Sequence, residues 1–175
     1  MGRSENQIRE GGGPAHRAES TTTTAPDRWR YARHLDALAA AAGTTVGAEA
    51  DAVAEVLRDR DPVMAESAVV THLDRRAAHL LTDAGFPGWA RAMDTAIGAR
   101  AFPARRLREW TLLKAITDGV PWSPAELTAA SDWCQRTAAR SLPSYEALDL
   151  LAATARTRRV RNAAAQRLHR RNIAS

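Results

Sequence analysis

Two histidines and an aspartate on one segment are the side chains best suited to metal chemistry. His72 and His79 are seven residues apart, and Asp83 follows four residues later, so all three lie on one face of a helix. Zinc accepts such ligands, but a zinc site needs three or four that converge. No other His or Cys completes the set. We therefore predict that both histidines lie on a helix surface and bind no metal.

The single cysteine, Cys134, is the one thiol that could act as a nucleophile. A catalytic thiol needs a base that lowers its pKa. Cys134 instead lies in an apolar stripe beside Trp133, which indicates a small core residue. The sequence has no nucleophile elbow, and Gly11–Gly13 precede no strand, as a phosphate-binding loop would require. We identify no catalytic residue, no metal site and no cofactor, and we expect a non-enzymatic protein; an enzyme of unfamiliar type is the third alternative.

Positive charge is concentrated at the C-terminal end. The formal net charge is +5, yet residues 1–149 contain 18 basic and 20 acidic side chains, whereas residues 150–175 contain seven arginines and no acid. The seven are Arg156, Arg158, Arg159, Arg161, Arg167, Arg170 and Arg171. Such an uncompensated cationic end predicts an anionic partner.

Two interpretations of this basic end remain open. In the first, the arginines bind nucleic-acid phosphates without reading a base sequence, because residues 146–175 contain no aromatic side chain for base stacking. Removal of residues 156–175 should then abolish duplex binding. In the second, the final helix is structural: it is either a solvated terminal helix, helped by cations near its C-terminal end, or a helix whose arginines pair with acids of the body. A helix-turn-helix over residues 124–155 is excluded, because Glu146 and Asp149 would face the phosphates.

The composition favours an all-α fold. Alanine is abundant, only nine residues are aromatic, and no segment alternates apolar and polar residues as a strand would. We predict seven or eight short antiparallel helices in a single domain of residues 27–175, with a basic C-terminal helix at about 156–171. The helices are expected at 27–42, 48–60, 62–84, 89–97, 107–118, 124–140, 144–155 and 158–171. Residues 1–26 offer little to bury and are expected to form a disordered N-terminal extension.

Capping residues set several of these boundaries. Asp61 is a candidate N-cap with Pro62 at the first helical position, and Gly119 is a candidate for the residue that ends the fifth helix. Ser123, followed three residues later by Glu126, predicts a capping box. Phe102 and Pro103 predict a break before the fifth helix.

An Arg-x-Ala-Ala pattern followed by leucine occurs three times. The copies begin at Arg75, Arg136 and Arg161. The last one, Val160 to Ala164, resembles the inner helix of HEAT-type repeats, and the resemblance covers mainly residues 131–171. It implies stacked helix pairs that bind other macromolecules. The copies lie 61 and 25 residues apart, however, and such arrays repeat at about 40–47 residues. An irregular helical bundle and a HEAT-like stack therefore both remain open.

Four tryptophans, Trp89, Trp110, Trp122 and Trp133, lie within 45 residues and are expected to pack in the core. Trp122, in the turn between Pro121 and Pro124, should be the most exposed and is a candidate anchor for a protein partner.

The first functional hypothesis from the sequence is a helical interaction or scaffold protein that binds another macromolecule. The alternative is a nucleic-acid-associated protein that uses the basic end. The cytoplasm is the expected location and no membrane contact is expected, because the chain has one cysteine, no apolar run of about 20 residues and no apolar stretch of a secretory signal.

Overall fold

The computed structural model describes residues 24–173, with side chains from residue 29 onward. This part of the chain contains nine α-helices and no strand, which confirms the all-α prediction. The helices are α1 (Thr24–Ala42), α2 (Val46–Val56), α3 (Pro62–Leu80), α4 (Phe86–Ile97), α5 (Ala101–Asp118), α6 (Pro124–Ala129), α7 (Asp132–Ser141), α8 (Tyr145–Thr154) and α9 (Arg158–Ile173). Of the extension expected at residues 1–26, residues 24–26 belong to α1 and the remainder lies outside the described residues.

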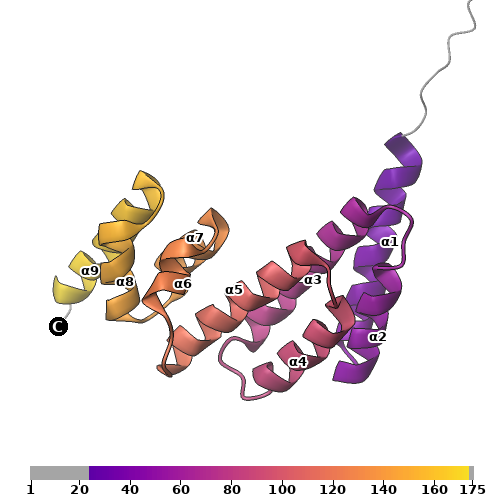
Figure 1. Cartoon of the computed structure of the whole chain (residues 1–175), viewed down its shortest axis with the longest axis horizontal. Coiled ribbons are helices and arrows are strands. Elements are labelled where there is room, and N and C mark those ends of the chain that lie inside the picture. The colour runs from indigo at the N-terminus through magenta and orange to yellow at the C-terminus, as the bar shows by residue number, and fades with distance from the viewer. Residues whose placement is uncertain (1–23, 174–175) are drawn as a thin grey trace, which may run out of the picture.

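The helices form two rows along an elongated molecule (Figure 1). In the first row α1 contacts α3, α3 contacts α5, α5 contacts α7, and α7 contacts α9. In the second row α2 contacts α4 and α6 contacts α8. Helices that are consecutive in the sequence, most extensively α8 and α9, join the rows. The short loops favour this arrangement, because they let most helices turn back against the one before.

Helix length varies strongly along the rows, from six residues in α6 to 19 residues in α1 and α3. The helix pairs therefore share no fixed length. The relation to HEAT-type repeats stays a prediction.

Side-chain caps start the helices where the sequence indicates. Asp61 accepts a hydrogen bond from the amide of Met64 at 3.1 Å, and Ser123 accepts one from the amide of Glu126 at 3.3 Å. Gly119 ends α5 with φ of 69°, a conformation that side chains with a Cβ rarely adopt. These three predicted caps are confirmed. The reciprocal half of the capping box is absent from the described residues, because the Glu126 carboxylate accepts no bond from the amide of Ser123.

Several predicted boundaries were wrong. The helix expected at 48–60 ends at Val56, the one expected at 62–84 ends at Leu80, and the one expected at 89–97 begins at Phe86. The segment expected as one helix over residues 124–140 is divided into α6 and α7, because Ala130 and Ser131 are extended and Ser131 caps the amide of Cys134 at 3.2 Å. The amide of Ser131 is held by Glu109 of α5 at 2.9 Å, so another helix stabilises the break. The break expected at Phe102 and Pro103 does not occur, since both lie in the first turn of α5, where proline is tolerated.

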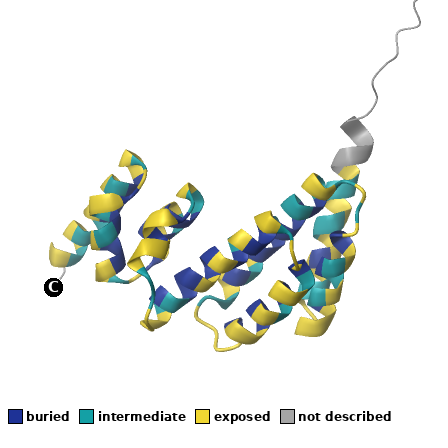
Figure 2. Ribbon diagram, viewed as in Figure 1, coloured by how far each residue is buried: buried dark blue, intermediate teal, exposed yellow. Residues whose placement is uncertain are grey.

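The buried residues, dark blue in Figure 2, lie on the helix faces that are turned toward neighbouring helices. Trp89 and Trp110 are buried, as predicted, with Trp89 in contact with Phe86 at a centroid distance of 5.6 Å. Trp133 is half-buried and packs edge-on against Trp110 at 5.2 Å. Trp122 is also half-buried. Cys134 is fully buried, which confirms its assignment to the core.

Glu49 of α2 is a buried carboxylate that three side chains from other helices bind. Its Oε1 lies 2.8 Å from Nε2 of His72, 3.0 Å from Nε of Arg76 and 2.9 Å from Nε1 of Trp89. Burial opposes ionisation of Glu49, but these hydrogen bonds outweigh it and lower its pKa from 4.5 to about 2. The carboxylate therefore ties α2 to α3 and α4.

The prediction that both histidines lie on the surface was wrong for His72, which is 4% exposed. A buried carboxylate needs hydrogen-bond donors, and α2 places Glu49 against this face of α3. His79 is exposed, as predicted.

A second group of polar side chains connects α3 and α5 to α7. Asp74 accepts hydrogen bonds from Nη1 of Arg106 at 2.5 Å and from Nε1 of Trp110 at 2.8 Å. The guanidinium of Arg106 also stacks over the ring of Trp133, 3.6 Å from its centroid. These contacts fix α7 against α3 and α5, and so they position the exposed face of α7.

Candidate anion-binding site

The buried amide of Gln135 on α7 holds the last four helices together. Its Nε2 donates to the carbonyl oxygens of Leu127 at 3.1 Å and Thr128 at 2.8 Å, near the end of α6. Its Oε1 accepts from the amide of Arg156, 3.0 Å away, at the start of the basic end. One side chain therefore sets where α9 begins relative to α6 and α7.

Helix α9 is docked. Val160 and Ala164 are buried against α7 and α8. This docking fixes the positions of its arginines.

Four of the seven predicted arginines bind backbone carbonyls, three of them at the C-terminal ends of α6, α7 and α8 and one in the loop before α8. Arg161 donates to the carbonyl of Ala155 at 2.6 Å and Arg167 to that of Ala139 at 3.1 Å. Arg156 donates to the carbonyl of Ala129 at 3.5 Å, and Arg171 donates to the carbonyl of Pro143. Carbonyls at helix C-termini carry partial negative charge and lack partners within the helix, which explains the attraction.

These contacts leave the positive charge largely uncompensated. Carbonyl oxygens satisfy hydrogen bonds but carry no full charge. Among the described residues, the basic end forms one ion pair with an acid, between Arg156 and Asp132 at 3.9 Å, and both side chains are about half exposed. Of the two forms of the structural interpretation, pairing with acids of the body is found only for Arg156 among the described residues, and carbonyl oxygens bind Arg161, Arg167 and Arg171 instead.

The remaining three predicted arginines, Arg158, Arg159 and Arg170, are exposed and have no hydrogen bond or ion pair with any described residue. Arg158 and Arg159 lie in the first turn of α9, which contains no acid. The N-terminal end of a helix is itself positive, so these two charges stand where the helix dipole disfavours cations and favours an anion.

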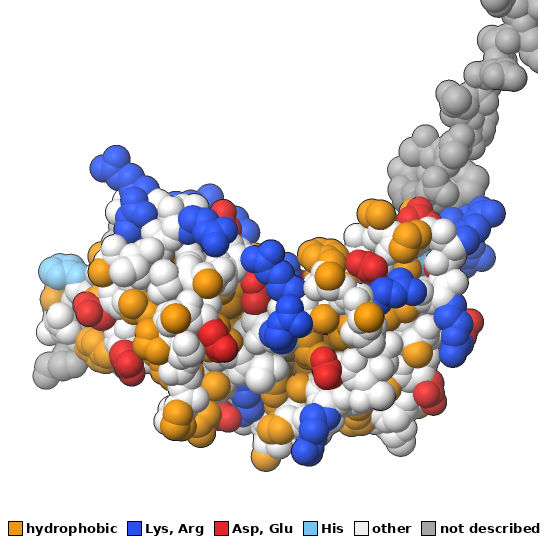
Figure 3. Space-filling model, viewed as in Figure 1, with side chains coloured by type: hydrophobic (Ala, Val, Ile, Leu, Met, Phe, Trp, Pro, Cys, Tyr) orange, Lys and Arg blue, Asp and Glu red, His pale blue; other side chains and the backbone are white. Residues whose placement is uncertain are grey.

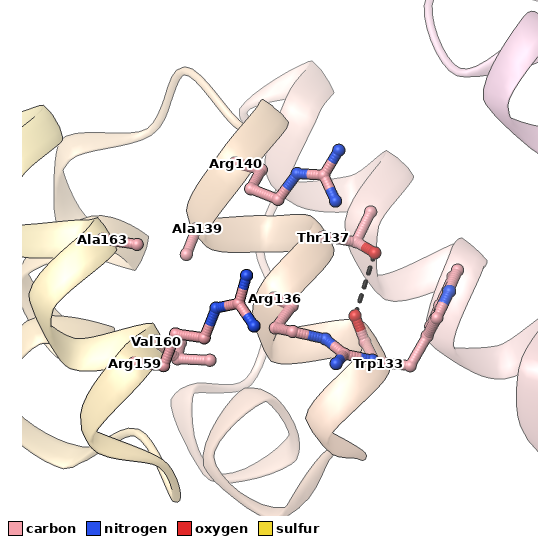
Figure 4. A pocket seen from close by; sticks show the side chains of 8 residues that line it. All are labelled: Trp133, Arg136, Thr137, Ala139, Arg140, Arg159, Val160 and Ala163. Atoms are coloured by element: carbon pink, nitrogen blue, oxygen red, sulfur yellow. Dashed lines mark hydrogen bonds between the residues drawn. The ribbon is translucent and has the colours of Figure 1, made fainter.

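A pocket of about 220 Å³ lies between α7 and α9 and is lined by three arginines (Figure 4). Its lining residues are Trp133, Arg136, Thr137, Ala139, Arg140, Arg159, Val160 and Ala163. None is acidic, and neither Arg136 nor Arg140 has a hydrogen bond or ion pair with a described residue. In Figure 4 the side chain of Arg159 extends from α9 toward α7. We name Arg136, Arg140 and Arg159 the arginine triad.

The surroundings reinforce this positive potential. Residues 131–173 contain nine arginines and three acids. Figure 3 shows basic side chains gathered along the upper edge of the end formed by the last helices. Burial first, and the charge of Arg171 second, lower the pKa of the Arg167 guanidinium below its usual range. One guanidinium group can donate two parallel hydrogen bonds to the oxygens of a phosphate, so the pocket is suited to phosphate.

Sequence reasoning found one residue of the triad, Arg159, and missed Arg136 and Arg140 as site residues. The signal that could have found them is their spacing of four on α7, which puts both on one helix face. Trp122 does not lie at this pocket but lines another, beside α5.

Comparison with protein-family models, with curated proteins and with solved structures found no match to this chain. Among residues 24–173, no helix combines the length and apolarity needed to cross a bilayer. The same part of the chain contains no group of three or more His, Cys, Asp or Glu side chains that could hold a metal ion.

Proposed function

We propose that this protein binds the phosphate backbone of a nucleic acid through the arginine triad. The observation that carries the proposal is that Arg136, Arg140 and Arg159 line one acid-free pocket, where none of them has a partner among the described residues. Unpaired like charges repel one another, and a phosphate oxygen placed among them would relieve that repulsion.

A polyanion fits this surface better than a single small phosphate. Arg158 and Arg170 add two exposed, unpaired charges on the same helix, beyond the pocket. A chain of phosphates could contact the triad and these outer arginines together, whereas one phosphate group could not.

Binding is expected to be independent of base sequence. Trp133 is the one aromatic residue of the pocket, and its ring already contacts Arg106 and Trp110. No aromatic ring of the pocket is therefore available as a platform for a base, and backbone contacts alone do not read sequence.

Fluorescence anisotropy with a labelled duplex of about 20 base pairs, at about 50 mM salt, tests the proposal. The test variant replaces Arg136, Arg140 and Arg159 by Gln. The matched control replaces Arg33, Arg60 and Arg75 by Gln, since these are also exposed and unpaired among the described residues but lie on α1, after α2 and on α3.

The triad variant should lose at least about tenfold in affinity, and the control should stay within about threefold of the unmodified protein. Equal losses in the two variants, or no binding by the unmodified protein, would reject the proposal. Point variants are preferable to removal of residues 156–175, because that truncation also removes the buried Val160 and Ala164. A protein partner, the first hypothesis from the sequence, would use a different surface, the one that contains Trp122.

A further inference from the structure

The second row of helices has a gap. α2 contacts α4 and α6 contacts α8, but α4 and α6 have at most marginal contact with each other. One face of α5 is therefore left uncovered between them. Two pockets of about 640 Å³ and 560 Å³ lie side by side there, and Arg108, Thr111 and Ala115 of α5 line both. We name the two pockets together the α5 groove.

The floor of the α5 groove is a stripe of side chains along α5. Arg108, Thr111 and Ala115 are spaced by three and four residues, so they lie on one helix face. Thr111 and Ala115 are small, and small side chains let a second helix approach closely. The lining residues of α5 run from Arg105 to Asp118, a length of about 20 Å at 1.5 Å per residue.

The two walls of the groove are apolar apart from Arg91 and Asp94 of α4 and Glu126 of α6. Phe86, Pro87 and Ala90 of α4 line one side. Trp122, before α6, and Ala129 of α6 line the other. Apolar side chains along a trough of this length favour an elongated apolar ligand over a compact polar one.

Arg108 is the unpaired charge of α5 that an occupant has to match. On the walls Arg91, Asp94 and Glu126 are also exposed and have no ion pair with a described residue. Among the charged lining residues of α5, Arg105 pairs with Glu109 at 3.4 Å and Lys114 with Asp118 at 2.7 Å. Arg108 is exposed, lines both pockets and has no hydrogen bond or ion pair with a described residue. A carboxylate of the occupant placed opposite Arg108 would complement it.

We propose that the α5 groove binds an amphipathic helix of a partner protein, and that this helix carries an acidic residue opposite Arg108. The helix would occupy the position that the second row leaves empty between α4 and α6. Its apolar side chains would enter both pockets across the small residues of the α5 stripe. The α5 groove shares no lining residue with the pocket of the arginine triad, so peptide binding and phosphate binding can be tested independently.

Selection from a displayed library of helical peptides of about 16 residues tests this proposal, with peptides first retained on the unmodified protein. Enriched peptides are then measured against Arg108→Glu and Thr111→Arg. The matched controls are Arg75→Glu, an exposed and unpaired arginine of α3, and Thr95→Arg, an exposed threonine of α4 outside the groove. Thr95 and Thr111 each donate to the carbonyl four residues earlier, so the two substitutions disturb similar bonds.

Enriched peptides should share apolar residues at helical spacing and one acid at a fixed position. They should bind Arg108→Glu and Thr111→Arg at least about tenfold more weakly, with controls within about twofold. Replacing that acid of the peptide by lysine should restore binding to Arg108→Glu. Peptides that bind all variants equally, or a failure to enrich any helical peptide, would overturn the proposal. Concentration-dependent dimerisation that Thr111→Arg abolishes would overturn it in favour of a second copy of this chain.

Discussion

Arg136 of α7 and Arg159 of α9 line the same pocket, although they lie 23 positions apart in the sequence. Neither guanidinium has a hydrogen bond or ion pair with another described residue. The fold therefore places like charges at one pocket whose lining contains no acidic residue. Such an arrangement gains stability when an anion binds, and this property distinguishes it from an ordinary solvated surface.

The first prediction concerns anion binding in thermal unfolding. Replacing chloride by phosphate at equal ionic strength should raise the Tm of the unmodified protein by a few degrees, because phosphate binds the native arginine triad. The variant with Gln at positions 136, 140 and 159 should gain less. Phosphate also stabilises proteins without specific binding, so the Arg33, Arg60 and Arg75 variant gives the baseline. Equal gains in both variants would contradict a phosphate site at the triad.

The second prediction concerns Gln135, which is fully buried. Gln135→Ala should lower the free energy of unfolding by about 2–4 kcal/mol, because three backbone groups lose a buried partner and a cavity is left. Urea unfolding measures this change. Gln166→Ala is the matched control, since Gln166 is exposed on α9 and has no side-chain hydrogen bond with a described residue. A loss in Gln135→Ala no larger than in the control would show that this amide does not hold the last helices together.

The third prediction follows from the low pKa of Glu49. Its pKa is about 2 in the folded protein and 4.5 ordinarily, so ionised Glu49 stabilises the fold above about pH 4.5. That contribution, on the order of 3 kcal/mol at neutral pH, is lost as the pH falls from about 4.5 to 2. Glu49→Gln should therefore be less stable than the unmodified protein near neutral pH, and the difference should shrink across this acidic range.

Urea unfolding at a series of pH values checks the Glu49 prediction. Glu146→Gln is the control, because Glu146 is exposed on α8 and has no side-chain hydrogen bond or ion pair with a described residue. A constant difference between Glu49→Gln and the unmodified protein from neutral to acidic pH would contradict the assignment.

The fourth prediction concerns the reactivity of Cys134. Burial first, and the charge of Glu109 second, raise the pKa of its thiol to about 12. The thiolate is the reactive form, so the native protein should react with a disulfide reagent far more slowly than the urea-unfolded protein at the same mildly alkaline pH. Rapid reaction of the native protein with one equivalent would show that Cys134 is accessible.

Local signals in the sequence predict most of the helices. Asp61, Ser123 and Gly119 act on backbone groups within a few residues, so their roles can be read without the fold. The division between α6 and α7 is different. Ser131 is a recognisable cap, but the break also depends on Glu109, which is 22 residues earlier in the sequence.

The candidate site could be predicted only in part, because its partners are chosen by packing. The excess of arginine in residues 150–175 is visible in the sequence, yet which arginines bind carbonyls depends on where α9 docks. His72 shows the same limit, since its partner Glu49 lies on another helix. Arg136 and Arg140 belong to the site only because α7 packs against α9.

The central claim is that three arginines between α7 and α9 contact nucleic-acid phosphates, and the salt dependence of duplex binding tests it most directly. Affinity should be measured from about 50 to 200 mM salt for the unmodified protein, the triad variant and the Arg33, Arg60 and Arg75 control. Each phosphate contact contributes about 0.9 to the slope of log affinity against log salt. The triad variant should therefore have a slope shallower by about three, while the control keeps the original slope. Identical slopes for all three proteins would contradict the claim.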